Sequence, residues 1–296
     1  MLKGLDTYTG HSDKVFAVAW SPDGRVIASA GRDWTVQVWD PATGTCFLTF
    51  RGHSQFLLSL AWSSDGRTVA SGCTGGLVQV WEADTGRILL TYHGHTRFVR
   101  CIAWSPDAHA IASGGDYGDS TVQVWEASSG KQIYVHKKQY RIFAAPWSPD
   151  GSRIASGSFD GTVQVWDALD GGNCFTYRGH NGPAYVVAWL VGGASIVSAG
   201  QDATVQVWSV ATGEIIQTYR GHTNAVKALA CSPDGHYVAS GGDDATVQVW
   251  AVATGKRIAT YGGHTTWVRT IAWSPDGRTI ASASDKTVHL WHIELI

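Results

Sequence analysis

The sequence is poor in features that define whole classes of protein. Only 16% of its 296 residues are charged, and 22 Lys plus Arg nearly balance 24 Asp plus Glu, for a formal net charge of −2. General nucleic-acid-binding proteins are usually basic, so this balance disfavours that function. No apolar run reaches the roughly 18 residues of a membrane helix, and the N-terminal MLKGLDTYTG has no signal-peptide core. We therefore expect a cytoplasmic protein that does not enter a membrane.

Cysteine pairs and nucleotide-binding motifs are missing as well. The five cysteines include no CxxC pair, and their odd number and wide spacing favour free thiols in a reducing compartment. There is no GxxxxGK[ST] and no GxGxxG that opens a helix. Against one Met stand 15 Trp and 35 Gly, and 44% hydrophobic residues suit a folded protein. The cysteines are Cys46, Cys73, Cys101, Cys174 and Cys231.

The abundant tryptophans belong to an internal repeat. The string TVQVW occurs five times, with LVQVW and TVHLW as variants, and the tryptophans that end the seven copies are 42, 44, 41, 42, 42 and 41 residues apart. Gly-His pairs recur with the same period, except that Lys138 occupies one histidine position. Seven units therefore consume the chain and leave no linker or second domain. The tryptophans are Trp39, Trp81, Trp125, Trp166, Trp208, Trp250 and Trp291, and the histidines are His11, His53, His95, His180, His222 and His264.

Each unit reads as four short strands. In residues 226–262, apolar residues alternate with small or polar ones, and the runs are rich in Val, Ile, Tyr and Trp, which is typical of strands. SPDG and ATG segments mark tight turns, since proline presets φ and glycine accepts a positive φ. Seven units of four strands without a helical stretch predict an all-β radial array.

The Gly-His near the start of each unit and the Trp-Asp at its end, as in Trp39-Asp40 and Trp166-Asp167, resemble the WD-repeat β-propellers. The resemblance covers the whole chain and implies a seven-bladed propeller, one domain over residues 1–296, with four antiparallel strands per blade. The last unit ends after its third strand, at about Ile293, and Leu5–His11 matches Ile216–His222. Residues near 3–9 are therefore expected to complete the seventh blade and close the ring. The expected blades are roughly 13–50, 55–92, 97–136, 140–178, 182–219, 224–261 and 266–293 plus 3–9.

Several units repeat a set of His, Ser, Asp and Trp. A Ser-His-Asp set could be a hydrolytic triad, but its recurrence favours a structural role, and the resemblance implies a hydrogen-bonded chain from Trp through Ser and His to Asp. Because the second unit has Gly75 for Asp and the fourth has Lys138 for His, we expect the second and fourth blades to be the least stable. The structural tetrads are His11, Ser29, Asp33, Trp39; His180, Ser198, Asp202, Trp208; and His222, Ser240, Asp244, Trp250.

Other candidate chemistry is weak. His93 and His95 lie on one side of a strand but have no evident third ligand. His289 and His292 are three residues apart on a strand, so they point to opposite faces. We expect no catalytic residues, no cofactor and no metal.

The units differ most where WD-repeat propellers build the rim of their upper face, three and five residues after the Gly-His histidine and just before the tetrad Asp. These 21 positions carry six Lys or Arg, six Phe or Tyr, Trp267 and one acid, Asp243. Trp34, beside Asp33, is expected on the same rim. The positions are Lys14, Phe56, Phe98, Arg141, Pro183, Ala225, Trp267; Phe16, Leu58, Arg100, Phe143, Tyr185, Lys227, Arg269; and Arg32, Thr74, Gly118, Phe159, Gln201, Asp243, Ser284.

This basic, aromatic rim predicts a non-enzymatic scaffold that binds an acidic or phosphorylated segment of another protein. The protein would act as a monomer or within a larger assembly. Reversing Arg100 and Arg141 to Glu should then abolish binding and leave the melting temperature unchanged. Two alternatives are single-stranded nucleic-acid binding on the same face and an enzyme that uses the central channel. The expected partner-binding residues are Lys14, Phe16, Arg32, Trp34, Phe98, Arg100, Arg141, Phe143, Phe159, Tyr185, Lys227, Trp267 and Arg269.

Overall fold

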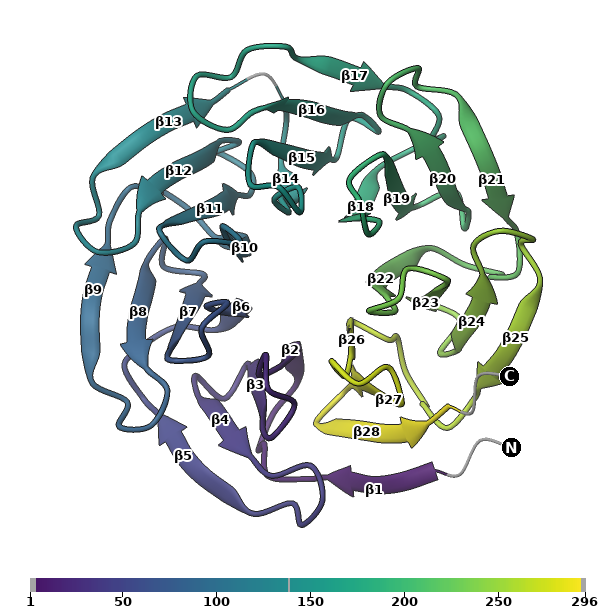
Figure 1. Cartoon of the computed structure of the whole chain (residues 1–296). Helices are drawn as coiled ribbons and strands as arrows, with labels where there is room; N and C mark the ends of the chain where they lie inside the picture. The colour runs from purple at the N-terminus through teal and green to yellow at the C-terminus, as the bar shows by residue number, and fades with distance from the viewer. Residues whose placement is uncertain (1–3, 138, 294–296) are drawn as a thin grey trace.

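The computed structural model describes residues 4–137 and 139–293, and in these residues the chain forms strands and turns but no helix. The strands make seven antiparallel four-stranded sheets arranged as the blades of a ring (Figure 1). The predicted all-β, seven-bladed propeller is confirmed. Within the described residues there is no helix long and apolar enough to cross a membrane.

Each blade runs from an inner strand at the channel to an outer edge strand (Figure 1). The first three blades contain β2 (Val15–Trp20), β3 (Ile27–Gly31), β4 (Val36–Trp39), β5 (Cys46–Phe50); β6 (Leu57–Trp62), β7 (Thr68–Cys73), β8 (Val78–Glu82), β9 (Ile88–Tyr92); and β10 (Val99–Trp104), β11 (Ala110–Gly115), β12 (Val122–Glu126), β13 (Gln132–His136). The next three contain β14 (Ile142–Ala144), β15 (Arg153–Ser158), β16 (Val163–Asp167), β17 (Phe175–Tyr177); β18 (Ala184–Trp189), β19 (Ser195–Gly200), β20 (Val205–Ser209), β21 (Ile215–Tyr219); and β22 (Val226–Cys231), β23 (Tyr237–Gly242), β24 (Val247–Ala251), β25 (Arg257–Tyr261). The seventh contains β26 (Thr270–Trp273), β27 (Thr279–Ser284), β28 (Thr287–His292) and, from the other end of the chain, β1 (Gly4–Tyr8).

The N-terminal strand closes the ring, as the sequence predicts. Strand β1 pairs antiparallel with β28, with Tyr8 opposite Val288. The Tyr8 ring stacks on Trp39 of the first blade with centroids 4.1 Å apart, and its hydroxyl donates to Gln37 Oε1 at 2.5 Å. Residue 3 of the predicted closing segment lies outside the described residues. One strand thus joins the last blade through its ladder and the first through a side chain.

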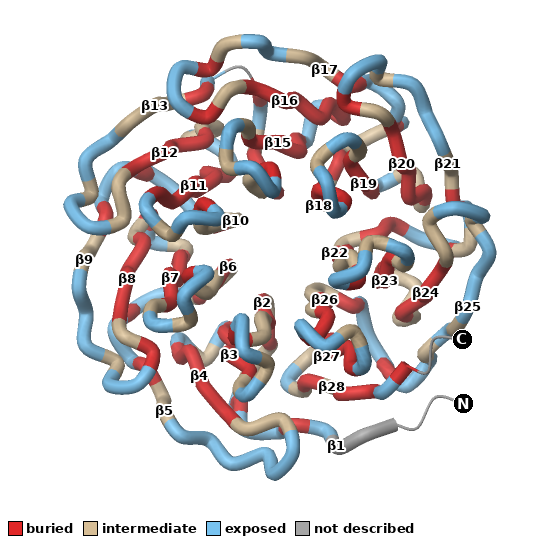
Figure 2. Tube along the Cα trace, in the orientation of Figure 1, coloured by how far each residue is buried: buried red, intermediate tan, exposed pale blue. Residues whose placement is uncertain are grey.

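The same stacking recurs between all neighbouring blades. An aromatic ring near the end of each outer strand lies nearly parallel to the third-strand tryptophan of the next blade, and these seven tryptophans are fully buried. Such pairs contribute about 0.5–1.5 kcal/mol beyond the area they bury. In Figure 2 the buried residues lie mainly on the inner three strands of each blade, while the outer strands are largely exposed. The other pairs are Phe50–Trp81, Tyr92–Trp125, His136–Trp166, Tyr177–Trp208, Tyr219–Trp250 and Tyr261–Trp291.

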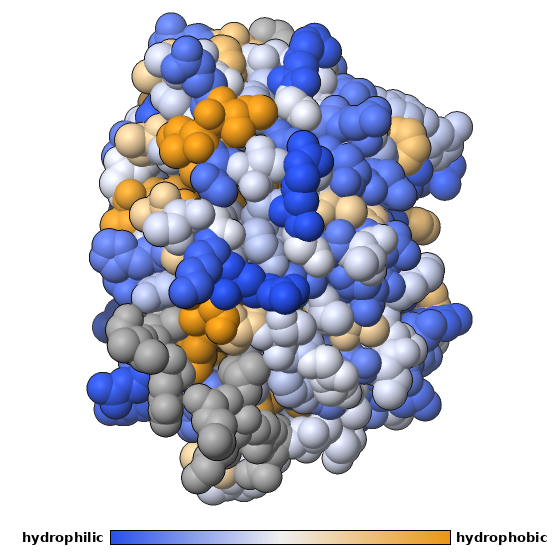
Figure 3. Space-filling model, turned by 90° about the vertical axis from the view of Figure 1, so that its right-hand side faces the viewer, coloured by the Kyte–Doolittle hydropathy of each residue, from blue (hydrophilic) through white to orange (hydrophobic). Residues whose placement is uncertain are grey.

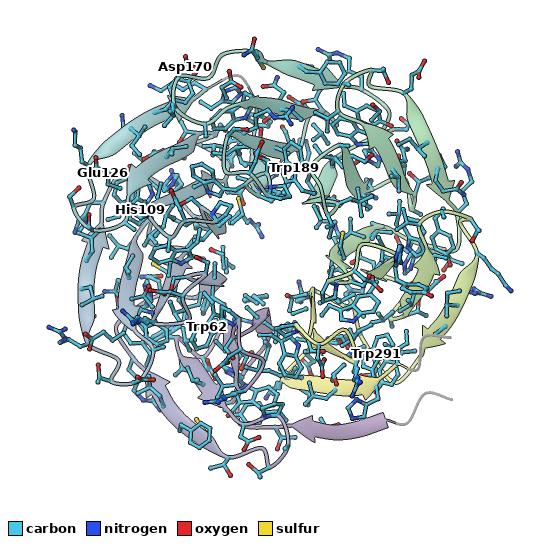
Figure 4. The ribbon with its side chains drawn as sticks, viewed as in Figure 1. Trp62, His109, Glu126, Asp170, Trp189 and Trp291 are labelled. Atoms are coloured by element: carbon cyan, nitrogen blue, oxygen red, sulfur yellow. The ribbon has the colours of Figure 1, made fainter. Side chains whose placement is uncertain are left out.

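A second ring of contacts joins the inner strands. The indole N–H of Trp62 donates to the carbonyl of Ala19 in the preceding blade at 3.3 Å, and that of Trp189 donates to Pro146 at 3.1 Å. Trp62 and Trp189 lie in the inner part of the ring (Figure 4). The buried indole N–H groups of Trp20 and Trp273 have no partner among the described residues, and the sixth blade has Cys231 at this position. This inner ring is therefore interrupted next to the closure.

The outer edge strands carry apolar side chains in contact with solvent. Phe47 on β5 is 62% exposed, and Ile216 on β21 is 58% exposed. On the side of the ring shown in Figure 3, small apolar patches lie between hydrophilic side chains. Scattered apolar residues of this kind are common on folded proteins and need no special function.

Two of the three predicted tetrads form completely. In the first blade, His11 lies 2.8 Å from Asp33 and 2.7 Å from Ser29, which accepts from the Trp39 indole at 3.0 Å. The His180, Ser198, Asp202 and Trp208 set has the same bonds at 3.0, 2.8 and 3.1 Å. Burial acts to raise the pKa of Asp33, but the hydrogen bond with His11 and the charge of its ring hold it at about 2.

The third predicted tetrad is only partly correct. His222 lies 2.8 Å from both Ser240 and Asp244, as expected. The indole N–H of Trp250, however, has no hydrogen-bond partner among the described residues, and the Ser240 hydroxyl donates to the backbone carbonyl of Gln248 at 3.4 Å. The Trp250 ring keeps its stacking contact with Tyr219, at 5.3 Å between centroids.

Blade three has a tetrad that the sequence analysis did not select. His95 lies 2.7 Å from Ser113 and 3.2 Å from Asp119, and Ser113 accepts from the Trp125 indole at 3.1 Å. Two extra residues before Asp119 shift its position in the sequence. The structure brings Asp119 back beside His95, although Nδ1 of His95 makes no hydrogen bond among the described residues.

The fourth blade is better connected than its sequence suggests. Lys138 lies outside the described residues, and the next residue, Gln139, takes the place of the histidine. Its amide donates to the carbonyl of Ser156 at 3.0 Å and to the Thr162 hydroxyl at 3.1 Å, and its Oε1 accepts from the Ser156 hydroxyl. Gln139 thus weakens the case for a labile fourth blade.

The second and seventh blades have incomplete tetrads. Nδ1 of His53 is buried and has no partner in the described part of the chain, because Gly75 stands where other blades have Asp. Burial lowers the pKa of His53 to about 4. Nδ1 of His264 is also unpartnered among the described residues. Burial, together with the nearby His289, lowers the pKa of His264 to about 3. We therefore expect these two blades to be the least stable.

Gly75→Asp should stabilise the protein by about 1–2 kcal/mol, because a carboxylate would reach the orphaned Nδ1 of His53. The site has room, since a Cβ at Gly75 would meet the flexible Gln55 side chain at 3.2 Å and the Cys73 sulfur at 3.4 Å, and no backbone atom lies within 4 Å among its three nearest neighbours. Urea unfolding measures the gain. Gly75→Ala is the matched control and should gain less, through reduced chain flexibility alone. Equal stability of the two variants would contradict the role of the missing acid.

Acid should destabilise the protein through the two unpaired histidines. Because the pKa values of His53 and His264 lie below the ordinary value of about 6.5, the unfolded chain takes up protons first as the pH falls. Stability should drop between pH 6.5 and about 4, by up to about 1.4 kcal/mol per pH unit for each histidine.

The matched variant is His53→Gln/His264→Gln, because Gln139 shows that glutamine can bond the tetrad serine. Thermal unfolding from pH 7 to 4 should show a shallower acid decline for this variant than for the wild type. Parallel declines would rule out these two groups as the cause.

Candidate functional site

Nine of the thirteen predicted partner-binding residues gather around one cavity of about 470 Å³ on the upper face. All seven positions that lie five residues after the histidine position line it, because each lies at the beginning of an inner strand or directly before it, next to the channel. Below the cavity, further side chains of the inner strands line the central channel. The lining residues are Phe16, Leu58, Arg100, Arg141, Phe143, Phe159, Tyr185, Lys227, Asp243, Trp267 and Arg269.

Two arginines on the wall share one carboxylate. Arg100 Nε lies 2.6 Å from Asp116 Oδ2, and Arg141 Nε lies 2.7 Å from Asp116 Oδ1. Asp116 is only 2% exposed. Although burial acts to raise the pKa of Asp116, hydrogen bonds from Arg141 and Arg100 hold it below its usual range. Asp116 is thus ionised at neutral pH and fixes both guanidinium groups.

Asp116 also corrects the predicted rim. Counting back from Asp119 selects Gly118 as the third rim residue of this blade. The backbone N–H of Asp116 bonds to the Phe98 carbonyl at 2.9 Å, as that of Asp243 bonds to Ala225 at 2.8 Å in the sixth blade. Asp116 therefore holds the rim position, and the upper face has two acids instead of one. The two extra residues of this unit were the sign in the sequence that its rim position could not be found by counting back from Asp119.

A lysine and an aspartate face each other on the opposite wall. Lys227 Nζ lies 3.8 Å from Asp243 Oδ2 and 3.3 Å from the centre of the Tyr185 ring. Burial lowers the pKa of Lys227, although Asp243 opposes the shift. Burial also raises the pKa of Asp243, against the charges of Lys227 and Arg269. The pair is loose, and a bound anion would compete with Asp243 for the ammonium group.

The remaining cations lie over aromatic rings. The guanidinium carbon of Arg269 is 5.3 Å from the centre of Phe16 and 5.5 Å from that of Trp267. That of Arg141 is 4.9 Å from Phe159. Rings at these distances hold cations in place without neutralising them. The wall therefore combines four positive side chains with one carboxylate, and Asp116 lies beneath it.

Four predicted residues lie away from the cavity wall: Lys14, Arg32, Trp34 and Phe98. Arg32 packs over Phe56 at 5.0 Å and lies 3.7 Å from Asp13. Trp34 and Phe98 are 49% and 40% exposed.

Tyr140, which the sequence analysis did not select, contacts Phe159 edge to face at 6.0 Å and extends the aromatic surface. No other unit has a tyrosine at the corresponding position, two residues after the histidine position. This position is not one of the three rim positions that the sequence analysis compared.

Within the described residues, no three His, Cys, Asp or Glu side chains are grouped as a metal ion would require. Nδ1 of His289 instead lies within hydrogen-bond distance of the Tyr261 hydroxyl, at 2.7 Å, and His292 bonds Thr279 at 2.8 Å. The distinctive chemistry of the described surface is the cationic, aromatic cavity.

Comparison with known proteins gives the family. The family model described as "WD domain, G-beta repeat" matches seven times, over residues 3–40, 44–82, 86–126, 129–167, 171–209, 213–251 and 255–292. The chain belongs to the WD-repeat family. Propellers of this family generally act as scaffolds that bind other proteins.

Individual relatives match this WD-repeat chain only over short segments. The peroxisomal targeting signal 2 receptor of Mus musculus is 34% identical over 73 residues, 23% of this chain and 23% of the receptor. The Notchless protein homolog of Arabidopsis thaliana is 39% identical over 67 residues, 22% and 14% of the two chains. A probable cytosolic iron-sulfur protein assembly protein CIAO1 homolog of Nematostella vectensis is 58% identical over 31 residues, 10% of each. The matches thus span less than a quarter of each relative.

The ion pairs change one expectation for this WD-repeat propeller. Arg100→Glu/Arg141→Glu cannot leave stability untouched, because it would place two new carboxylates beside the buried Asp116. We expect a loss of about 2 kcal/mol, less than a fully buried pair would cost, since both arginines are about a third exposed.

Denaturant unfolding tests this expectation, with Arg269→Glu as the control, because Arg269 makes no ion pair with a described residue. The control should lose much less. A double variant as stable as the wild type would show that Asp116 tolerates the loss of its partners.

Proposed function

We propose that the protein is a non-enzymatic binding module that captures an acidic or phosphorylated segment of another protein in the cavity of its upper face. One observation carries the proposal: Arg100, Arg141, Lys227 and Arg269 come from four blades and surround a single cavity. Cations that converge on a partly enclosed space of low dielectric attract anions more strongly than the same charges spread over a surface. The slightly negative net charge of the chain makes this concentration selective.

The aromatic side chains support a protein partner. Trp267 is 52% exposed at the edge of the cavity, beside Arg269. Trp and Arg are the residues most enriched at binding hot spots, since they combine large apolar area with directional hydrogen bonds. A cavity of about 470 Å³ accommodates one or two side chains of a peptide. The flanking peptide residues would lie over the rim at Phe98 and Trp34.

The alternative on this face is single-stranded nucleic acid. Stacking of bases needs open aromatic faces along a groove. Here Phe16, Phe159 and Tyr185 already have cations over their rings. The cationic groups also surround a compact cavity and do not line a track. We therefore favour a peptide, and we place its recognition in the cytoplasm.

Binding to arrays of phosphorylated and acidic peptides tests the proposal. The wild type should bind a subset of them, and Arg269→Glu should weaken that binding at least tenfold, because it replaces an attractive charge by a repulsive one. Trp267→Ala should also weaken it, with little change in Tm. Arg25→Glu is the matched control: its side chain is 85% exposed on a turn of the opposite face.

Equal peptide binding by the wild type and Arg269→Glu would place the function elsewhere on the molecule. Binding of a polynucleotide, with a steep salt dependence and loss in Arg269→Glu, would favour the nucleic-acid alternative.

A further inference from the structure

Arg100 and Arg141 form a pair of unusual rigidity. Arg100 lies on β10 of the third blade, and Arg141 precedes β14 of the fourth, so the two come from different sheets. Each uses Nε to bond Asp116, at 2.6 and 2.7 Å. Their terminal Nη groups donate no hydrogen bond to a described residue, and both side chains line the cavity. Asp116 therefore holds both guanidinium groups through their Nε atoms, and the Nη donors are unused by the described residues.

The segment that holds the pair is a departure from the repeat. Residues 116–120 include the two-residue insertion of the third unit. Asp116 supplies the shared carboxylate, and the Ser120 hydroxyl accepts from the backbone N–H of Arg141 at 3.2 Å. Arg141 has φ 53° and Ser120 has φ 55°, backbone conformations that are uncommon outside glycine. One inserted segment thus orients Arg141 through both its backbone and its side chain.

Aromatic contacts complete the arrangement. The Arg141 guanidinium carbon lies 4.9 Å from the Phe159 ring centre and 5.7 Å from that of Phe143. That of Arg100 lies 6.0 Å from Phe143. The Phe143 ring therefore lies close to both guanidinium groups, and both arginines still line the cavity. Little rotational freedom remains for the two groups to lose when an anion binds.

We propose that Asp116, Arg100 and Arg141 form a clamp for a doubly charged phosphate monoester on the side chain of a partner protein, with Asp116 as the positioning residue. The proposal rests on the proposed function and specifies its ligand. Two guanidinium groups match the three oxygens of a phosphate, whereas a carboxylate has only two oxygens and one charge. Around the cavity, four cations and two carboxylates leave a net charge of +2, which complements the −1.5 to −2 of a phosphate monoester at neutral pH.

The sign of one substitution separates positioning from simple electrostatics. Asp116→Asn removes a negative charge and should strengthen the binding of any anion if charge alone matters. If Asp116 orients the arginines, the same change should weaken phosphate binding, because one Nε group loses its acceptor and the other keeps only an uncharged one. The isosteric amide keeps one acceptor oxygen, so the site stays filled.

The probes are N-acetyl-phosphoserine amide and N-acetyl-glutamate amide. Their titration is followed by the Nε–H resonances of arginine-labelled protein. In the wild type, the phosphoserine probe should shift the Arg100 and Arg141 signals and bind at least tenfold more tightly than the glutamate probe. In Asp116→Asn, phosphoserine binding should weaken about tenfold and the preference should fall. Thermal unfolding of each variant monitors the fold. Ser120→Ala, which removes only the backbone contact of Arg141, should give a smaller effect in the same direction.

Equal or tighter phosphoserine binding by Asp116→Asn would overturn the positioning role, and absence of arginine shifts in the wild type would overturn the clamp. If acidic peptides still bind the wild type and are lost in Arg269→Glu, the proposed function survives and only the phosphate assignment fails. Loss of all peptide binding on the array, with no arginine shifts, would refute both.

Discussion

The structure depends on a stacking contact that crosses every boundary between blades. A four-stranded blade cannot bury a tryptophan on its third strand by itself. The indole ring is covered only when the outer strand of the preceding blade places an aromatic ring against it, as Phe50 does for Trp81 at 4.4 Å. Each tryptophan is also bonded within its own blade where its N–H reaches the tetrad serine, as in Trp81 and Ser71 at 3.1 Å. The same side chain thus holds a blade together and joins it to its neighbour.

Closure follows from the same constraint. An open array would leave the first tryptophan, Trp39, without a stacked partner, and Tyr8 supplies that partner from the far end of the ring. The contacts of β1 and Tyr8 matter more than those at other junctions, because the indole N–H groups of Trp20 and Trp273, in the first and seventh blades, donate to no carbonyl of the described residues. The seventh blade also has an incomplete tetrad. The indole-to-carbonyl bonds that join the inner strands of other blades are therefore missing at the closure within the described residues. The pairing of β1 with β28 and the contacts of Tyr8 compensate for them.

The sequence predicts the fold well because the same pattern of strand and turn residues occurs in all seven units. Strand order and closure follow from the repeat, and the complete tetrads at His11 and His180 follow from its resemblance to the WD-repeat propellers. The predictions fail where the position of a residue in the repeat does not determine which partner its side chain reaches. Gln139, one residue beyond the expected position, bonds Ser156 because its side chain is long enough to do so. Asp116 was missed because the two-residue insertion changes the register, and the backbone bond to Phe98 shows which residue holds the rim position. Nothing in the sequence predicts that the Trp250 indole N–H lacks a partner among the described residues, since its unit has all four tetrad residues in place.

A repeat protein acquires a specific site by breaking its own pattern, and here two departures adjoin. The insertion in the third blade brings Asp116 and Ser120 to the rim, and the fourth blade lacks the Gly-His pair that fixes this loop elsewhere. Because Gln139 takes the histidine role one residue late, the chain between it and β14 is one residue shorter than the corresponding segment in five of the other six blades. Arg141 then enters the strand in a left-handed conformation, beside the hydroxyl of Ser120. In this arrangement the Nε of Arg141 lies 2.7 Å from the carboxylate that also bonds Arg100. The irregular junction between the third and fourth blades therefore interrupts the repeat, and there two arginines from different blades share one buried carboxylate.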